Sequence, residues 1–187
     1  MQSNVDLSTS RILIVDDARE NVRVLASILK DEATVSFSLG GQDALAKATD
    51  TVPDLILLDV EMPDMNGHEV IARLKKDPRT APIPVIFVTS HSEVEDEEEG
   101  LRLGAIDYIT KPFNPSIVRA RVRNQLMLRG YAKQLEALNA ELVRLATTDP
   151  LTGVANRRAF RERATHELRR IERYGGGACL MMMDLDH

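Results

Sequence analysis

Residues 11–17 read Arg-Ile-Leu-Ile-Val-Asp-Asp, an apolar run that ends in two adjacent carboxylates. The run combines leucine with β-branched residues and has no polar alternation, which is typical of a strand buried on both faces of a sheet. A second run of the same kind, Leu55–Leu58, also ends in an acid, Asp59. The two runs together predict a buried sheet with acidic residues at the ends of its strands.

The pattern of these two runs continues over the first 128 residues. Five apolar runs alternate with amphipathic segments at roughly 21–30, 42–49, 68–76, 93–102 and 115–128. The runs are Ile12–Val15, Val35–Leu39, Leu55–Leu58, Val85–Val88 and Ile106–Ile109. Strand–helix repetition of this kind predicts an α/β fold, a parallel sheet covered by helices on both faces with right-handed crossovers. In the fourth helix, Ser92 and Glu95 have the spacing of a capping box.

Composition narrows the class of protein and its partners. The chain has 187 residues, 43% of them hydrophobic and 28% charged, as in a soluble globular protein. Its net charge of −5 argues against a nucleic-acid partner. A single cysteine, Cys179, fits a reducing compartment. The first residues lack a signal-peptide core, and no apolar run is long enough to cross a membrane. We therefore expect a cytoplasmic protein with no membrane association.

Polar residues follow four of the five apolar runs, where parallel strands present ligand sites. They are Asp16-Asp17, Asp59, Thr89-Ser90 and Lys111-Pro112. Any one acid could simply cap a helix or begin a loop, but five such groups at matching strand ends argue for a site. Carboxylates so close together repel unless a cation neutralises them, and an all-oxygen ligand set suits Mg²⁺. A carboxylate can also act as a nucleophile and form an aspartyl phosphate.

These residues resemble the receiver domains of two-component response regulators. The loop Met62-Pro63-Asp64-Met65-Asn66-Gly67 and the segment Gly104-Ala105-Ile106-Asp107-Tyr108 also match, so the resemblance covers roughly residues 10–128. It implies a flavodoxin-like (βα)5 doubly wound sheet with strand order 2-1-3-4-5. It also implies that Mg²⁺ is held by Asp17, Asp59 and the backbone carbonyl of Glu61, with Asp16 contributing through water.

The same resemblance assigns roles in phosphoryl transfer. Asp59 is expected to accept the phosphoryl group from a histidine kinase or phosphotransfer protein. Thr89 would hydrogen-bond a phosphoryl oxygen, and Lys111, before a cis peptide bond to Pro112, would pair with it. Tyr108 matches the switch aromatic of the family, although an ordinary half-buried strand tyrosine would look the same. Phosphorylation would draw Thr89 inward and leave space for the Tyr108 ring.

A leucine-rich stripe follows the receiver segment. It consists of Leu128, Tyr131, Leu135, Leu138, Leu142 and Leu145, spaced 3, 4, 3, 4 and 3 residues apart. This a/d spacing predicts that the fifth helix continues as a helical stalk. The stripe could pack on its own domain or form a parallel coiled coil. We favour a homodimer, through the stalk or through the receiver face formed by residues 93–102, 106–109 and 115–128.

The last segment is similar to the start of GGDEF-type diguanylate cyclases. The resemblance rests on Asp149–Arg158, followed by Met183-Asp184-Leu185-Asp186-His187, and covers roughly residues 147–187. It implies that Asp184 is a metal ligand below the phosphates of GTP in a full-length cyclase. The chain contains no Gly-Gly-(Asp/Glu)-Glu-Phe loop, so we expect no cyclase activity from the residues given. The apolar run Ala178–Met183 is the only strand expected here, and this incomplete α+β segment is expected to be mobile or atypically packed.

The sequence thus predicts a disordered N-terminus at 1–10, a receiver domain at 11–127, a signalling helix at 128–147 and a GGDEF fragment at 148–187. The favoured function is a response regulator whose parent protein makes cyclic di-GMP from two GTP molecules. The alternative is a dimerisation and interaction module with a degenerate final segment. A phosphohydrolase with an aspartyl nucleophile is disfavoured, because that class uses an Asp-x-Asp pattern whereas Asp16 and Asp17 are adjacent.

Overall fold

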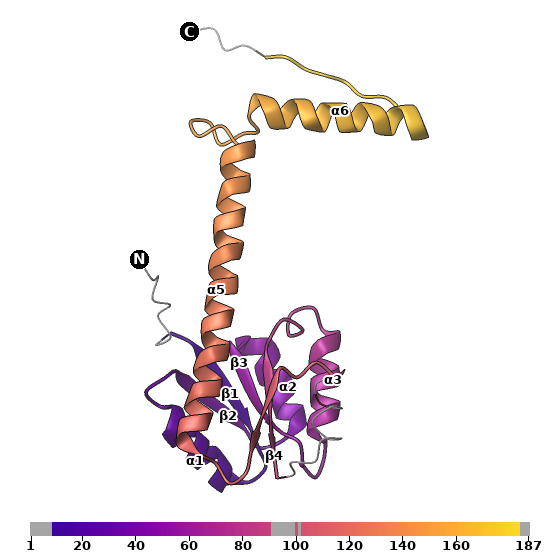
Figure 1. Cartoon of the computed structure of the whole chain (residues 1–187). Coiled ribbons are helices and arrows are strands. Elements are labelled where there is room, and N and C mark those ends of the chain that lie inside the picture. Colours follow the sequence, from indigo (N-terminus) through magenta and orange to yellow (C-terminus); the bar gives the residue numbers. More distant parts are fainter. Residues whose placement is uncertain (1–8, 91–99, 101, 184–187) are drawn as a thin grey trace. The chain divides into compact units, whose positions relative to one another are not determined.

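The computed structural model of the protein describes residues 9–90, 100 and 102–183 (Figure 1). Its compact units are residues 1–132 and 133–187, described separately below. Three predictions concern residues outside the described ones: the disorder expected for the N-terminus before residue 9, most of the helix predicted at 93–102, and the role of Asp184.

The first unit is built on a five-stranded parallel sheet. The strands are β1 (Arg11–Val15), β2 (Thr34–Ser38), β3 (Leu55–Asp59), β4 (Val85–Thr89) and β5 (Asp107–Thr110). Their order across the sheet is β2-β1-β3-β4-β5, with every neighbouring pair parallel. The predicted fold class and strand order are confirmed.

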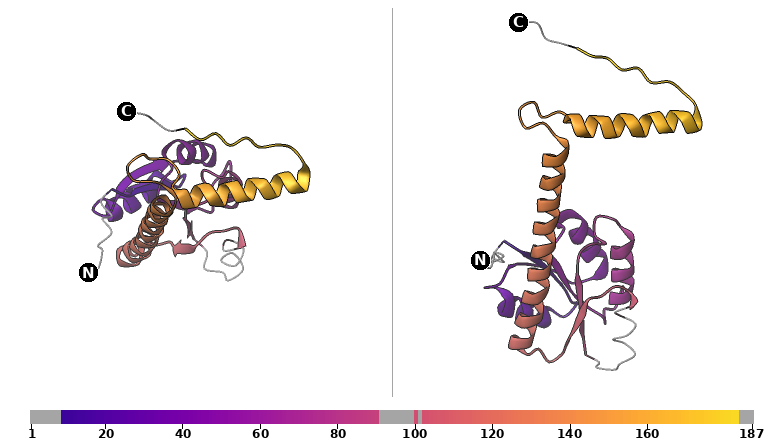
Figure 2. Two further views of the ribbon diagram at one scale, coloured as in Figure 1. Left: turned by 90° about the horizontal axis from the view of Figure 1, so that it is seen from above. Right: turned by 45° about the horizontal axis from the view of Figure 1, so that its top comes forward.

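Helices cover both faces of this sheet (Figures 1 and 2). They are α1 (Arg19–Leu29), α2 (Gly41–Thr51), α3 (Gly67–Lys76) and α5 (Pro115–Thr147). On one face, Ile12 and Ile14 of β1 pack in a cluster with Leu25 of α1 and Val122 of α5. On the other face, Leu13 and Val15 of the same strand pack with residues of α2 and α3. Because successive strand residues point to opposite faces, a strand covered on both sides must be apolar throughout.

Helix α5 begins at Pro115 and remains helical to Thr147, as the leucine stripe predicted. Its buried residues, Val118, Val122 and Leu126, all belong to the first third or so of the helix. Beyond them the apolar stripe is exposed, with relative exposures between 50% at Tyr131 and 69% at Leu135. The stripe is therefore not covered by the chain itself within the described residues.

The second unit contains a turn and one further helix, α6 (Arg157–Tyr174). Asp149 organises the turn, since its Oδ1 accepts hydrogen bonds from the backbone N–H of Leu151 at 3.1 Å and of Thr152 at 2.9 Å. Asn156 caps α6 by accepting a hydrogen bond from the N–H of Ala159 at 2.9 Å. This capped helix lies within the GGDEF-like segment.

The strand predicted at Ala178–Met183 is wrong. These residues have no regular secondary structure, and the side chain of Met182 is 91% exposed. A strand is stabilised by hydrogen bonds to a neighbouring strand, and no described strand pairs with this run. The expected mobility of residues 150–187 stays a prediction.

Gly67, the first residue of α3, tests how tightly the sheet edge is packed. A Cβ atom there would clash with the backbone oxygen of Asp59 and lie 2.9 Å from Cα of Val60. We expect Gly67→Ala to lower the free energy of unfolding by about 2 kcal/mol or more in urea denaturation. Gly40→Ala is the control, because nothing lies within 4 Å of its Cβ position and its backbone is extended. Equal stability of the two variants would contradict the close approach of α3 to Asp59.

Candidate phosphoacceptor site

The register of the sheet brings the predicted site residues to one edge. Val15 pairs with Leu58, Asp59 pairs with Val88, and Thr89 pairs with Thr110. The residues that follow β1 and β5, Asp16 and Lys111, therefore leave the sheet beside Asp59 and Thr89. The expected convergence at the carboxyl ends of the strands is present in the structure.

Three carboxylates form the centre of the site. One oxygen each of Asp16, Asp17 and Asp59 lie within 4.8 Å of one another. Asp16 is 1% exposed and Asp59 is 2% exposed, whereas Asp17 faces solvent. An all-oxygen donor set that is open on one side fits a hard divalent cation, which keeps some of its waters.

Lys111 supplies the positive charge that the cluster needs. Its Nζ lies 2.9 Å from Oδ2 of Asp59 and 3.2 Å from Oδ2 of Asp16. The backbone N–H of Lys111 donates to the carbonyl of Thr89 at 2.8 Å, which fixes the start of the loop. The following peptide bond, to Pro112, is cis. One ammonium group is thus shared by two buried carboxylates.

The balance of these charges sets the protonation of the site. Burial raises the pKa of Asp59 to about 6, and the nearby charge of Asp16 adds to the rise, while the hydrogen bond from Lys111 opposes it. Burial acts to lower the pKa of Lys111, but its bonds to Asp59 and Asp16 outweigh burial and raise this pKa. Without a cation, the site therefore carries an ammonium group and a carboxylate that gains a proton easily.

The other predicted residues lie around this cluster. Thr89 is buried at the end of β4. The N–H of Glu61 donates to Oδ1 of Asp59 at 3.4 Å, so the backbone of Glu61 adjoins the Asp59 carboxylate. Tyr108 is half-buried and packs against the cluster of apolar residues beneath α2 and α3.

Two contacts near the site were not predicted from the sequence. The side-chain amide of Asn21 donates to both oxygens of Asp16, at 3.0 and 2.9 Å. Asn21 precedes the buried Leu25 by one helical turn, so an amide beside the apolar face of α1 was the signal that could have revealed it.

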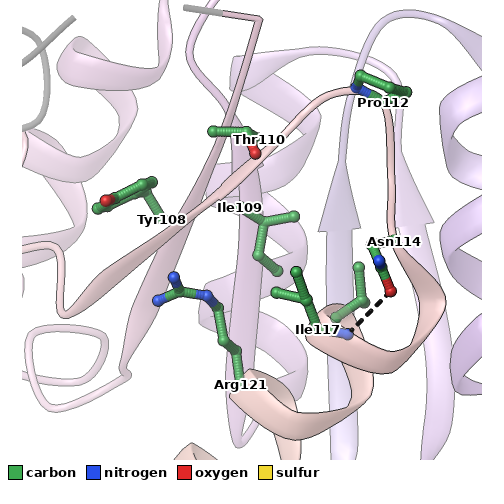
Figure 3. A pocket seen from close by; sticks show the side chains of 8 residues that line it. Tyr108, Ile109, Thr110, Pro112, Asn114, Ile117 and Arg121 are labelled. Atoms are coloured by element: carbon green, nitrogen blue, oxygen red, sulfur yellow. Dashed lines mark hydrogen bonds between the residues drawn. The ribbon is translucent and has the colours of Figure 1, made fainter. Parts of the chain in front are cut away.

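The second contact joins α5 to β5. Arg121 forms an ion pair with Asp107, and its guanidinium carbon lies 5.2 Å from the ring centroid of Tyr108. Figure 3 shows Arg121 directed toward Tyr108 beside a hollow of about 90 Å³. Arg121 follows the buried Val118 of α5 by three residues, which places both near one side of that helix.

Comparison with known proteins agrees with this geometry. A family model described as the response regulator receiver domain matches residues 12–123, and one described as the diguanylate cyclase GGDEF domain matches residues 146–187. Because the first match covers more than half of the chain, the protein belongs to the response regulator receiver family.

Named relatives extend this assignment. The chain is 44% identical over 117 residues to the response regulator PleD of Caulobacter vibrioides, covering 62% of this chain and 26% of PleD. It is 41% identical over 121 residues to a probable cyclic di-GMP phosphodiesterase of Vibrio cholerae, covering 65% of this chain and 27% of that protein. The chain therefore spans about a quarter of the length of these two relatives.

Solved structures show the same fold. The signal receiver domain of a putative Luxo repressor protein from Vibrio parahaemolyticus is 26% identical, with a TM-score of 0.65 over 68% of this chain and 98% of that one. The chemotaxis protein CheY4 of Vibrio cholerae is 29% identical, with a TM-score of 0.60 over 63% of this chain and 98% of that one. Among the described residues of the present chain, no helix is both long and apolar enough to cross a membrane.

The raised pKa of Asp59 predicts a pH-dependent stability in the absence of metal. In the folded protein the Asp59 carboxyl keeps its proton up to about pH 6, whereas in the unfolded chain it loses the proton near pH 3.8. Because the folded state binds more protons between these two pH values, the free energy of unfolding falls as the pH rises through this window. Asn cannot ionise, so we expect the free energy of unfolding of Asp59→Asn to increase relative to that of the wild type by on the order of 2 kcal/mol between about pH 4 and pH 7.

The measurement is denaturant unfolding at several pH values in the presence of a chelator. Asp31→Asn, at an exposed acid outside the cluster, is the control and should follow the wild-type pH profile. Parallel profiles for Asp59→Asn and the wild type would contradict a raised pKa.

Proposed function

We propose that the protein is a phosphorylation-controlled response regulator in which Asp59 accepts the phosphoryl group. The observation that carries this proposal is the sharing of Lys111 between Asp59 and Asp16 within a three-carboxylate cluster. An ion pair whose only role is stability needs one carboxylate for one ammonium group. Here two buried carboxylates share one ammonium group, and this excess of negative charge favours a site that binds a metal cation together with a phosphoryl group.

In this proposal Asp17, Asp59 and the carbonyl of Glu61 would hold Mg²⁺, while Asp16 would act through water. When bound, the ion would neutralise the carboxylates and stabilise charge on the phosphoryl oxygens. An Asp59 oxygen attacks the phosphorus of a phosphohistidine on a kinase or phosphotransfer protein. The phosphorus–nitrogen bond breaks, and the imidazole leaves neutral after taking up a proton from solvent. Lys111 then pairs with the phosphoryl group and Thr89 donates its hydroxyl to it.

The proposed response lies on the side of β5 and α5. Movement of Thr89 toward the phosphoryl group would free space for the Tyr108 ring, which now lies against Arg121. Because Arg121 belongs to α5, a change at Tyr108 alters the packing of the helix that continues into the exposed stripe. A local charge would thus bias the position or pairing of α5.

The proposed output is a diguanylate cyclase. The match of residues 146–187 to the GGDEF family supports it, as does the similarity of the receiver to PleD. In such a protein the stalk would bring two cyclase domains together, each with one GTP, and Asp184 would bind metal there. The likeness to a probable cyclic di-GMP phosphodiesterase is compatible with the same signalling molecule, but the GGDEF match favours synthesis.

We predict that beryllofluoride with Mg²⁺, a mimic of the phosphoryl group, binds the wild-type chain and fails to bind Asp59→Asn. The expected loss of affinity is at least about a hundredfold, since Asp59 supplies both the bond to beryllium and a metal ligand. Calorimetric titration measures it, with Asp31→Asn as the control. Equal binding by Asp59→Asn would remove the phosphoacceptor assignment.

We also predict that Leu135→Asp with Leu138→Asp reduces self-association of the chain by at least about tenfold. The reason is that two charges would enter the apolar seam of a coiled coil. Sedimentation with beryllofluoride and Mg²⁺ present measures the dimer constant.

Ala137→Asp with Ala140→Asp is the matched control for this stalk variant. It introduces the same charges at positions outside the a/d stripe of the same helix segment. A wild type that stays monomeric at high concentration, or equal loss in both double variants, would contradict pairing through the stripe.

A further inference from the structure

Both oxygens of the buried Asp16 carboxylate are contacted by hydrogen-bond donors of the protein. Its Oδ1 accepts hydrogen bonds from the backbone N–H of Ala18 at 2.9 Å and from Nδ2 of Asn21 at 3.0 Å. Its Oδ2 accepts from the same Nδ2 at 2.9 Å and lies 3.2 Å from Nζ of Lys111. Each oxygen of this buried carboxylate therefore has two donors.

These contacts use the acceptor capacity of Asp16. A carboxylate offers about four lone-pair sites, and three donor groups occupy them, with the Asn21 amide shared between both oxygens. With three donor groups on its two oxygens, Asp16 is already engaged by the protein itself before any cation binds. It can still donate negative charge to the site at a distance and anchor Lys111.

Asn21 is the group that makes this arrangement rigid. If its amide were absent, Asp16 would keep only the contacts from Ala18 and Lys111, and its carboxylate could rotate. A less satisfied buried carboxylate would hold the ammonium group of Lys111 more closely, at the expense of Asp59. A neutral amide supplies the missing donors without adding a charge that would compete with Lys111 or with a metal ion.

We propose that Asn21 is a positioning residue for phosphoryl transfer, which acts through Asp16 to keep Lys111 shared with Asp59. This inference rests on the proposed role of Asp59. It places the function of Asn21 in the transfer step, because the amide donates to Asp16, whereas the proposed direct metal ligands are Asp17, Asp59 and the carbonyl of Glu61. Partners that orient charged groups at metal sites typically change activity by about 10- to 100-fold when they are removed.

The test uses the full chain, acetyl phosphate and Mg²⁺. Asn21→Leu keeps the size of the side chain and removes its donors. We expect its maximal rate of Asp59 phosphorylation at saturating Mg²⁺, followed by mass spectrometry, to fall about tenfold or more. The dissociation constant for Mg²⁺ alone, measured by calorimetry without phosphodonor, should change less than about threefold. Asn21→Ala, which favours the helix, gives a second variant for the same two measurements.

The control separates positioning from stability. Thr80→Val removes a buried hydroxyl that donates to the carbonyl of Leu74 at 2.7 Å, before the amino end of β4 and away from the site. It should lower the unfolding temperature and leave the phosphorylation rate of folded protein within about twofold of the wild type. A rate loss in Thr80→Val equal to that in Asn21→Leu would overturn the inference.

Two other results would also overturn it. The first is a rate in both Asn21 variants within twofold of the wild type, and the second is a weakening of Mg²⁺ binding that accounts for the whole rate loss. Failure of the wild type itself to become phosphorylated, or equal phosphorylation of Asp59→Asn, would instead refute the proposed function. The two failures are therefore distinguishable.

Discussion

The repulsion among Asp16, Asp17 and Asp59 is the constraint on which the site depends. Asp16 and Asp59 are buried, and buried carboxylates this close are tolerated only if opposite charge and hydrogen-bond donors compensate them. Lys111 provides the charge, and Asn21 with the backbone of Ala18 provides donors. Burial, with a smaller contribution from the charge of Asp16, nevertheless keeps the pKa of Asp59 raised to about 6. An all-oxygen site of this kind fits a divalent cation.

The packing of the sheet keeps the acids in place despite their repulsion. Apolar side chains of β1 and β3 point alternately into two separate clusters, so a shift of either strand by one residue would exchange its two faces. Gly67 lets α3 approach the backbone of Asp59 so closely that a Cβ atom at Gly67 would clash with the backbone oxygen of Asp59. The acids are therefore held by contacts on their strands and not by contacts with each other.

The sequence predicted those parts of the fold and site in which a residue pattern is compatible with only a few structures. Continuous apolar runs such as Leu55–Leu58 are typical of strands buried on both faces of a parallel sheet. Because the carboxyl ends of parallel strands lie at one edge, the acids that follow these runs meet there. The amide of Asn21 and the pairing of Arg121 with Asp107 were not predicted, because a polar residue on an amphipathic helix has many possible partners. The run Ala178–Met183 was misassigned because strand formation depends on a neighbour as well as on composition.

A short chain of contacts links the site to the exposed stripe of α5. The carbonyl of Thr89 accepts the N–H of Lys111, and α5 begins at Pro115, four residues further on. From there Val118, Val122 and Leu126 anchor the helix in the core, while Arg121 pairs with Asp107 next to Tyr108. Because α5 is one continuous helix from Pro115 to Thr147, its packed residues and its exposed stripe belong to the same element. In the proposed function, a rotation of this helix would change which residues of the stripe can pair with a second copy, so that α5 would transmit the effect of a charge placed on Asp59.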